Sequence, residues 1–309
     1  MTSANQKKEK YVGRFNQVKV YFLKFVRIFF AEKQWFMIVM AAVIAWIVAF
    51  VVGRAFFVTM EGTLLGALAL VCVCLWNGVF NSIQVVCKER QIIKREHRSG
   101  LSITSYVASH MLIQMILCAI QSIVTILVLA ICGVHFPEAG VVTPVFVIDL
   151  FVTVFLTTYG ADMLGLMVSC IVRNTTLAMT VMPFLLIVQL VFAGVAFPLA
   201  GFADKVSELT VTKHGVTAIC SIGDYNSLSS MSILNPLRKI ESRSQIVKEA
   251  VEMVSEETIA RETAKMMQDE NYNPTVENVL IQWATLIISS AVYVLIGWVA
   301  LKFVDKDRR

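Results

Sequence analysis

The sequence has little charge and few of the residues that bind metals or react with substrates. Of its 309 residues only 16% are charged, and it contains four histidines, six prolines and seven cysteines. No nucleophile with a neighbouring base and no pair of carboxylates suited to catalysis is evident, which argues against an enzyme. We therefore expect no metal, no catalytic site and no nucleic-acid partner. The histidines are scattered without ligand spacing: His97, His110, His135 and His214.

Two further features are missing. A phosphate-binding loop of the form G-x-x-x-x-G-K-[ST] is absent, so no ATP is expected on this chain. The start, "MTSANQKKEKYVGRFNQVKVYFLKFVRIFFAEK", has no short apolar core followed by a small-residue cleavage site. We expect the first apolar span to be retained and not cleaved as a signal peptide.

Apolar residues dominate what is present. They make up 57% of the chain and fall in blocks of about 20 residues, the length of a helix that crosses a bilayer. The pattern predicts an all-α polytopic membrane protein with six transmembrane helices. The predicted spans are 35–53, 63–87, 105–133, 143–171, 177–197 and 278–303.

The basic residues predict the orientation of these spans. Eight of the 27 lysines and arginines lie in residues 1–34, five in 88–98, one at Arg173 and four at the C-terminal end. The short connectors of the opposite face hold only Arg54. By the positive-inside rule, both termini are expected on the cytoplasmic side of the cell membrane.

The positions of the cysteines relative to the predicted spans do not suggest a set of disulfide bonds. Five lie within predicted spans, Cys87 lies at a cytoplasmic end, and only Cys220 is outside. An intermolecular pair through Cys220 and a buried thiol are both possible, the buried thiol being the favoured alternative.

Residues 14–33 have a helical period that places seven apolar residues on one face and polar or basic residues on the other. This pattern predicts an amphipathic interfacial helix at the inner membrane surface, either as a lipid anchor or as a contact for a partner. The apolar face consists of Phe15, Val18, Phe22, Phe25, Val26, Phe29 and Phe30.

A charged stretch, "KERQIIKREHRSGLSITSY", separates the second and third predicted spans. An orientation signal would explain its basic residues but not Glu89 and Glu96, because acids contribute little to topology. These two acids are seven residues apart and share a face of a helix. The stretch is therefore interpreted as a short docking helix over 88–98.

Three segments carry a family resemblance. The run "FNSIQVVCKERQIIKREHRSGLSITSY", with E-R-x-x-x-x-R-E-x-x-x-G and a tyrosine, resembles the segment between the second and third spans of type-2 ABC permeases of the G-subfamily kind. "GLMVSCIVRNTTLAMTVMPFLLIVQLVFAGVAFPL" is similar to their fourth-span end, turn and fifth span. "LTVTKHGVTAICSIGDYN" is similar to the segment that follows the fifth span.

The resemblance implies a transport subunit, most simply an exporter, that works as a dimer with two ATPase domains. The chain lacks the signature loop of the ABC ATPases, so ATP and Mg are expected on a separate ATPase subunit. The second permease copy could be identical or different. By family likeness the lead-in helix and the 88–98 helix contact the ATPase through Glu89, Arg90, Arg95 and Glu96.

The resemblance also assigns a substrate pathway between the second and fifth spans. The outer gate falls on Val195 and Ala196. Where G-subfamily drug exporters place an aromatic ring this chain has Asn77, whose amide could instead hydrogen-bond a neighbouring helix. The pathway positions are Leu70, Cys74, Asn77, Ile187 and Leu190.

Two acids lie in the fourth predicted span. Asp149 is expected near the outer interface, whereas Asp162 lies deeper and could serve proton coupling or a structural contact to another helix. A secondary transporter or channel driven by an ion gradient is therefore the alternative function, although no inverted repeat is evident.

The expected domains are the 1–34 tail and connecting helix, a 35–303 permease domain and a 304–309 cytoplasmic tail. Residues 198–277 are expected to form an external segment, helical over 242–270, between spans five and six.

Overall fold

The computed structural model describes residues 13–195, 199–229 and 268–303, and this part of the chain is helical, without a strand. One isolated bridge joins Thr59 and Ser229. The first helices are α1 (Arg14–Ala31), α2 (Phe36–Val52), α3 (Met60–Ser82), α4 (Val85–Arg98), α5 (Ile103–Ile131) and α6 (Phe146–Ile171). They are followed by α7 (Thr175–Val191), α8 (Phe202–Ser207), α9 (Val211–Ile222), the short η1 (Tyr225–Ser227) and η2 (Glu270–Tyr272), and α13 (Val276–Lys302).

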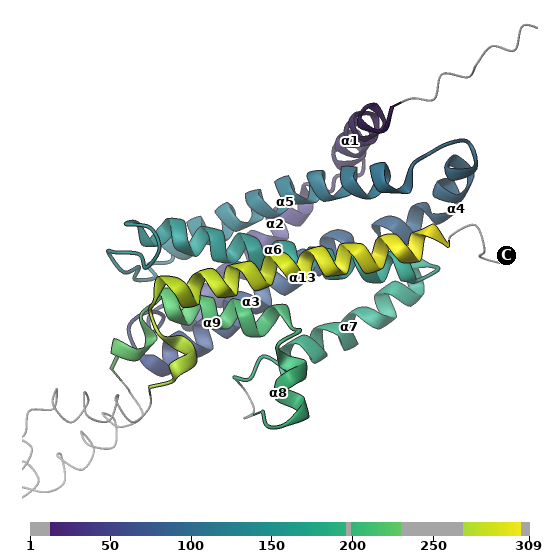
Figure 1. Cartoon of the computed structure of the whole chain (residues 1–309). Helices are drawn as coiled ribbons and strands as arrows, with labels where there is room; N and C mark the ends of the chain where they lie inside the picture. Colours follow the sequence, from purple (N-terminus) through teal and green to yellow (C-terminus); the bar gives the residue numbers. More distant parts are fainter. Residues whose placement is uncertain (1–12, 196–198, 230–267, 304–309) are drawn as a thin grey trace, which may run out of the picture.

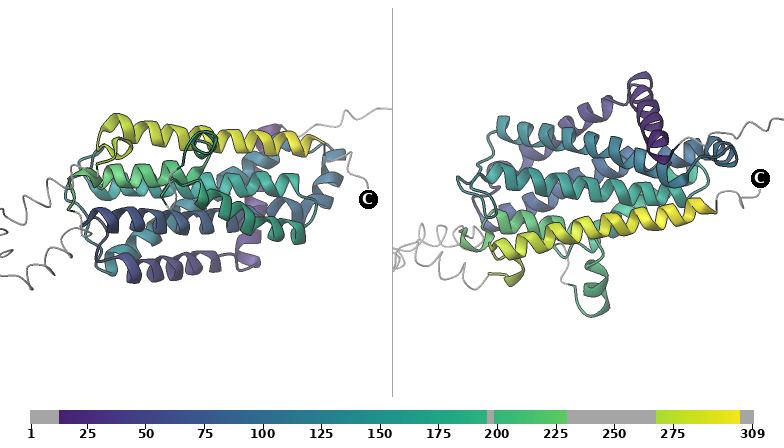
Figure 2. Two further views of the ribbon diagram at one scale, coloured as in Figure 1. Left: turned by 90° about the horizontal axis from the view of Figure 1, so that it is seen from below. Right: turned by 45° about the horizontal axis from the view of Figure 1, so that its top comes forward.

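Helix α6 lies at the centre of the bundle. It packs along α3 on one side and α13 on another, and it also contacts α4, α5 and α9. The long helices run side by side, while α1 stands at a steep angle to them against α5 (Figures 1 and 2). Helix α4 and the C-terminal end of α13 lie at the same end of the body (Figure 1).

Close helix contacts require glycine at two places between α3 and α6. A Cβ on Gly78 would lie 2.3 Å from the carbonyl oxygen of Thr158, and one on Gly165 would lie 2.6 Å from Ser82 Oγ. Small residues of this kind let membrane helices approach closely, where van der Waals contacts drive their association. The α3–α6 pair therefore forms the tightest part of the body.

Four of the described α-helices begin at a side-chain cap. Thr59, Asn174, Thr210 and Thr275 each stand one residue before a helix, and their side chains accept a hydrogen bond from the backbone N–H three residues later. Such a cap satisfies one of the N–H groups that a helix start leaves without an internal partner. These positions fix the beginnings of α3, α7, α9 and α13.

Each of the six predicted spans overlaps an apolar helix: α2, α3, α5, α6, α7 and α13. By length and composition, however, only the α3–α4 run, α5, α6 and α13 qualify as spans among the described residues. Helices α1 and α2 pass the same test only together, as a pair bent by 65°. Helix α7, with 17 residues, is shorter. Four spans, or five with the bent pair, are supported, and the sixth stays a prediction.

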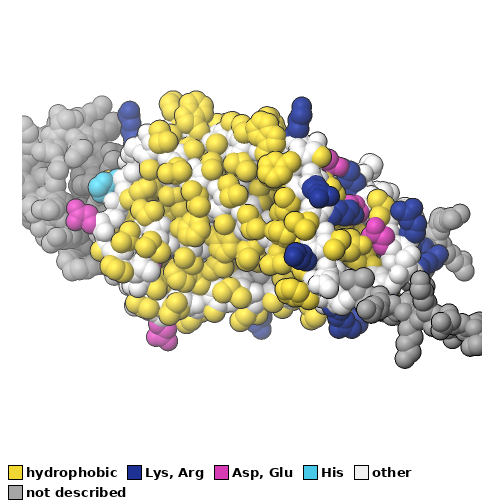
Figure 3. Space-filling model, turned by 90° about the horizontal axis from the view of Figure 1, so that it is seen from above, with side chains coloured by type: hydrophobic (Ala, Val, Ile, Leu, Met, Phe, Trp, Pro, Cys, Tyr) yellow, Lys and Arg dark blue, Asp and Glu magenta, His cyan; other side chains and the backbone are white. Residues whose placement is uncertain are grey.

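The surface of the body is apolar around its middle (Figure 3). Large apolar side chains stand exposed on α2, α5 and α13, among them Phe50, Leu127 and Ile288. Charged side chains gather at the end where α1 and α4 lie (Figure 3). An apolar belt of this extent is the surface that helices present to lipid tails.

Helix α9 lies inside the body. Apart from Lys213, all its residues are buried, and it packs against α3, α6 and α13. Part of the predicted external segment 198–277 therefore belongs to the helical core, and Cys220 is a buried free thiol. Most of the helical prediction for 242–270 falls outside the described residues, as does the 304–309 tail.

Candidate functional site

The charged stretch forms helix α4, which begins directly after α3 and is anchored on α6. Its apolar residues Val86 and Ile93 are buried, and the backbone N–H groups of Val86 and Cys87 donate to Ser169 Oγ at 3.0 and 3.2 Å. A hydroxyl from α6 thus occupies the place of an N-terminal cap. The start of α4 is fixed to the last turns of α6.

Arg90 makes a second connection between α4 and α6. Its side chain is buried, and Nη1 donates to the carbonyl oxygens of Cys170 at 2.7 Å and Val172 at 3.2 Å. These carbonyls lie at the C-terminal end of α6, where the helix dipole favours a cation. The Arg90 guanidinium therefore caps the C-terminal end of α6 by satisfying these two carbonyl groups.

The acids of α4 face α1. Glu89 accepts from the Tyr106 hydroxyl at 3.2 Å and lies 3.3 Å from Lys24 Nζ, and Glu96 accepts from the Tyr21 hydroxyl at 2.7 Å. A third pair, Lys88 with Glu32 at 2.8 Å, lies at the C-terminal end of α1. We call these three connections, Tyr21–Glu96, Lys24–Glu89 and Glu32–Lys88, the α1–α4 clamp.

The pKa shifts within the clamp agree with its hydrogen bonds. Burial, reinforced by the hydrogen bond to the Glu96 carboxylate, raises the pKa of the Tyr21 hydroxyl above its ordinary value. The hydrogen bond from Lys88 lowers the pKa of the Glu32 carboxyl. At neutral pH Tyr21 is therefore a donor, Glu32 is an anion, and both contacts are at full strength.

The four predicted ATPase contacts thus occupy different environments. Arg95 is exposed, Glu89 and Glu96 are partly buried against α1, and Arg90 is buried against α6. The shared face predicted for the two acids is the face toward α1. Arg95 and its exposed neighbours Gln91 and Ile92 form the outward side of α4.

The predicted pathway residues are not gathered around one described cavity. Leu70 and Cys74 are buried within the core, and Asn77 borders a cavity of about 400 Å³ between α2 and α3. That cavity is lined by neither Ile187, which is exposed on α7, nor Leu190. Of the two gate positions, Val195 is partly buried and Ala196 lies outside the described residues.

A polar seam between α3, α5 and α6 was missed by the sequence analysis. Asn81 and Gln121 pair through both amide groups, at 2.8 and 3.1 Å, and Gln114 Nε2 donates to the Asn81 carbonyl at 3.1 Å. His110, Gln114 and Gln121 recur at helical spacing along α5, and this polar stripe is the signal that could have revealed the seam. Paired amides in a membrane bundle satisfy each other across helices.

The two intramembrane acids differ in their partners. Asp149 accepts from the backbone N–H groups of Val142 at 2.8 Å and Thr143 at 3.0 Å, which holds the preceding loop on the start of α6. Asp162 accepts from Cys118 Sγ at 3.2 Å, and its other oxygen, Oδ1, is buried without a hydrogen-bond partner in the described part of the chain. Asp162 therefore has a structural contact and one unused acceptor.

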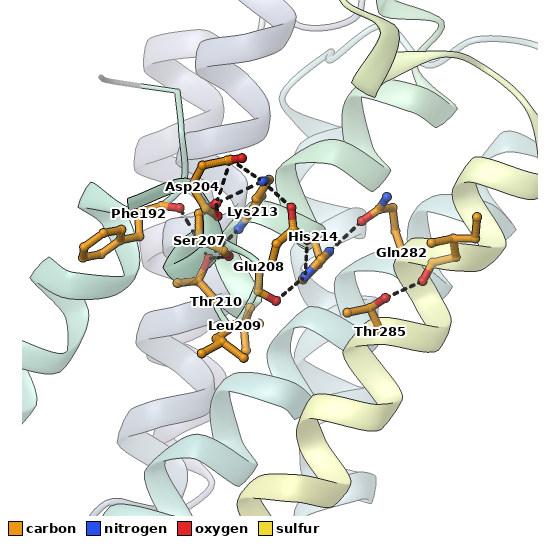
Figure 4. A network of polar contacts seen from close by, with 12 residues as sticks. Phe192, Asp204, Ser207, Glu208, Leu209, Thr210, Lys213, His214, Gln282 and Thr285 are labelled. Carbon is orange, nitrogen blue, oxygen red and sulfur yellow. Dashed lines mark hydrogen bonds and ion pairs between the residues drawn. The ribbon is translucent and has the colours of Figure 1, made fainter. Parts of the chain in front are cut away.

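A second polar network ties α8 and α9 to α13 (Figure 4). Lys213 Nζ lies 2.6 Å from Glu208 and 3.1 Å from Asp204. The His214 ring lies between Gln282 Oε1 at 2.7 Å and the Glu208 carbonyl oxygen at 2.9 Å. These contacts hold the chain that follows α7 against the last helix.

Within the ranges that the structure describes, no three histidine, cysteine or acidic side chains come together as a metal site would require. What the geometry provides is a mechanical connection from the exposed side of α4 to α1, α5 and α6.

Comparison of the sequence with known proteins points to a transporter family. Residues 17–222 match the family model described as ABC-2 type transporter. The chain is also 33% identical, over 153 residues, to the ABC transporter ATP-binding/permease protein Rv1747 of Mycobacterium tuberculosis (strain ATCC 25618 / H37Rv). That match covers 48% of this chain but only 17% of the relative's length. Because the family match spans well over half of the sequence, this chain belongs to the ABC-2 type transporter family and is a type-2 ABC transporter permease.

Proposed function

We propose that this chain is the permease of an ATP-driven exporter in the cell membrane, with both termini cytoplasmic and energy supplied by a separate ATPase subunit. Family membership supports an ATPase partner, and the relative's printed name joins an ATP-binding part to a permease. The charged end of the body, which holds α1 and α4, is the cytoplasmic side in this proposal.

The observation that carries the proposal is the double attachment of α4. One side of this helix is bound to α1 by the α1–α4 clamp and to α6 by Arg90, while Arg95 is exposed on another side. A motor that pushed on the exposed side would move α1, α4 and α6 together. Differential contact with the ATPase in its two states would then bias the permease between inward-facing and outward-facing forms.

In this proposal the predicted docking residues have different roles. Arg95 contacts the ATPase directly, whereas Glu89, Glu96 and Arg90 transmit the displacement to the neighbouring helices. The substrate crosses between α3 and α7 of two permease copies, where Ile187 is exposed in the single chain. The full span count is six, with α2 and α7 lengthened by their flanking turns.

Reconstitution tests this function. The chain and the candidate ATPase, encoded beside it or elsewhere in the same genome, are placed in proteoliposomes with ATP on one side. We expect a complex of two permeases and two ATPases that moves substrate only with hydrolysable ATP. Transport by the permease alone on an ion gradient would refute the proposal and favour secondary transport.

A further inference from the structure

A cavity of about 320 Å³ lies at the charged end of the body, between α1, the start of α4 and the first half of α5. It borders the 400 Å³ cavity between α2 and α3, and the two share Glu32, Gln34, Met37, Phe80 and Asn81 in their walls. Both volumes fall in the range of small-molecule sites in proteins. Together they form one groove with a charged opening and an apolar interior.

One ring nitrogen of a buried histidine in the groove lacks a hydrogen bond within the described part of the chain. His110 is 2% exposed, forms part of the wall of the first cavity, and its Nε2 atom has no hydrogen-bond partner among the described residues. Its ring is held in place by Phe25, with ring centroids 3.8 Å apart, and by Tyr106 at 4.7 Å. Buried polar atoms are nearly always satisfied, so an unpaired ring nitrogen in a cavity wall indicates a missing ligand atom.

The opening of the groove presents both signs of charge. Lys88 and Glu32 form an ion pair there, with side chains 57% and 44% exposed, and Glu89 lies on the same wall. A ligand group with a single charge would meet an unfavourable partner at this opening. A zwitterionic group can place an anion at Lys88 and a cationic donor at the carboxylates.

The inner part of the groove is mostly apolar, although the amide side chains of Asn77 and Gln121 also border it. Met40, Ile44 and Trp76 line the second cavity, which continues along α2 and α3. These two helices also carry exposed apolar side chains such as Trp46 and Phe80, as lipid-facing helices do. A hydrocarbon chain can enter this part without leaving an apolar environment.

We propose that the groove binds a phospholipid with a zwitterionic ethanolamine headgroup. One acyl chain lies between α2 and α3, and the phosphate and ammonium groups lie at Lys88 and Glu32. The His110 tautomer with hydrogen on Nε2 donates to an oxygen of the lipid's ester region. The bound lipid fills the angle between α1 and α2 and so supports the α1–α4 clamp. The site depends on the membrane setting of the family and not on ATP-driven export.

Photolabelling of the full-length protein in nanodiscs tests the site. The probe is phosphatidylethanolamine with a diazirine on its acyl chain, present as a minor component. Unlabelled phosphatidylethanolamine, phosphatidylcholine and phosphatidylglycerol of equal chain length compete in separate arms, and water-soluble glycerophosphoethanolamine competes in a fourth. We expect labelled peptides from α2 and α3, with the ethanolamine lipid as the strongest competitor and the soluble headgroup without effect.

Three variants complete the test. His110→Leu removes the ring nitrogen and should lower labelling about fivefold, the factor expected for loss of one hydrogen bond. Met37→Trp fills both cavities at their shared wall and should abolish labelling. Val39→Trp, two residues away and exposed on the same helix, should leave labelling unchanged. Size-exclusion profiles and melting curves establish that each variant is folded.

The proposal is overturned by any of three results. Equal competition by the three lipids would make the groove a nonspecific lipid contact. Competition by the soluble headgroup alone would remove the acyl chain from the site. Wild-type labelling of a folded Met37→Trp variant would place the lipid elsewhere.

Discussion

The Tyr21 hydroxyl donates a 2.7 Å hydrogen bond to the Glu96 carboxylate, which is 75 residues away in the sequence. This contact joins α1 to the C-terminal end of α4, while Lys24, one turn further along α1, pairs with Glu89 nearer to the start of α4. Two contacts at separate points fix the angle between the helices, which one contact could not do. The α1–α4 unit can therefore move as one piece.

Reversal of Glu89 to Lys places an ammonium group beside Lys24 and should open the clamp without changing insertion, because the stretch stays basic. We expect normal membrane abundance, near-basal ATP hydrolysis and transport reduced roughly tenfold, within the usual range of coupling free energies. ATP hydrolysis and transport are measured with the ATPase partner in proteoliposomes. The double variant Lys24→Glu, Glu89→Lys restores an ion pair and should recover part of the loss.

Glu138→Lys provides the matched control, because this acid is exposed on a loop remote from the clamp. It should behave as wild type. Full transport and substrate-stimulated ATP hydrolysis in both Glu89→Lys and Glu96→Lys would contradict the coupling role of residues 88–98. The charge of this stretch would then serve only as an orientation signal.

The Glu32–Lys88 pair should make the stability of α1 depend on pH. The pKa of Glu32 is lowered in the folded protein from its ordinary value of 4.5, so its contribution is present above that value and is lost as pH falls through the lowered value. Both side chains are more than a third exposed, so the pair is expected to contribute at most about 1 kcal/mol and to weaken in salt. Hydrogen exchange of the α1 amides, compared between wild type and Glu32→Gln, measures the difference. A difference that persists in acid or is unaffected by salt would contradict this assignment.

The Asn81–Gln121 pair permits a double-mutant cycle. Asn81→Leu or Gln121→Leu leaves one buried amide without its partner and should lower the free energy of unfolding by about 1–3 kcal/mol. The double variant removes both polar groups and should cost less than the sum of the two single changes. Thermal unfolding in detergent provides the measurement. Strict additivity would show that the two amides do not depend on each other.

Gly78 should tolerate no side chain. A methyl group there would lie within 2.3 Å of the Thr158 carbonyl, so Gly78→Ala must push α3 from α6, at a cost of about 1–3 kcal/mol. Gly160→Ala is the control, because its nearest neighbours would be at 3.4 Å, an ordinary contact. Melting temperatures of the two variants should separate clearly; equal values would mean that the α3–α6 contact is looser than described.

Topology is tested by cysteine labelling in a background without other cysteines. The orientation of the six spans places Ile92→Cys inside and Val254→Cys outside. In sealed right-side-out vesicles a membrane-impermeant maleimide should label only the second. Labelling of both from the same side would refute the six-span topology.

Much of the fold could be predicted from the sequence because apolar run length and helical period are local properties. The predicted spans 105–133 and 143–171 correspond closely to α5 and α6, and the helix predicted over 14–33 is α1, which ends at Ala31. The common face of Glu89 and Glu96 also followed from spacing alone. What that face contacts depended on the angle between α1 and α2, which no local pattern encodes.

The remaining features required tertiary information. Helix α9 has a polar sequence for a core helix, with two threonines, a histidine and a serine, yet it is buried because Gly215 allows close approach to Thr157 and Val71. The pairing of Asn81 with Gln121 connects residues 40 apart and depends on the register of α3 against α5. Neither property is visible in composition or periodicity.

Helix α6 is held at both of its ends. Asp149 binds the loop at its start and Arg90 binds its last carbonyls, and the 26 residues between Phe146 and Ile171 span about 39 Å. Because neither terminal turn is free to unwind, a displacement applied at one end of α6 is transmitted along the helix axis to the other end. Its first turn would therefore follow movements of α4 across the full thickness of the hydrocarbon, and the close glycine contacts would carry α3 along with it.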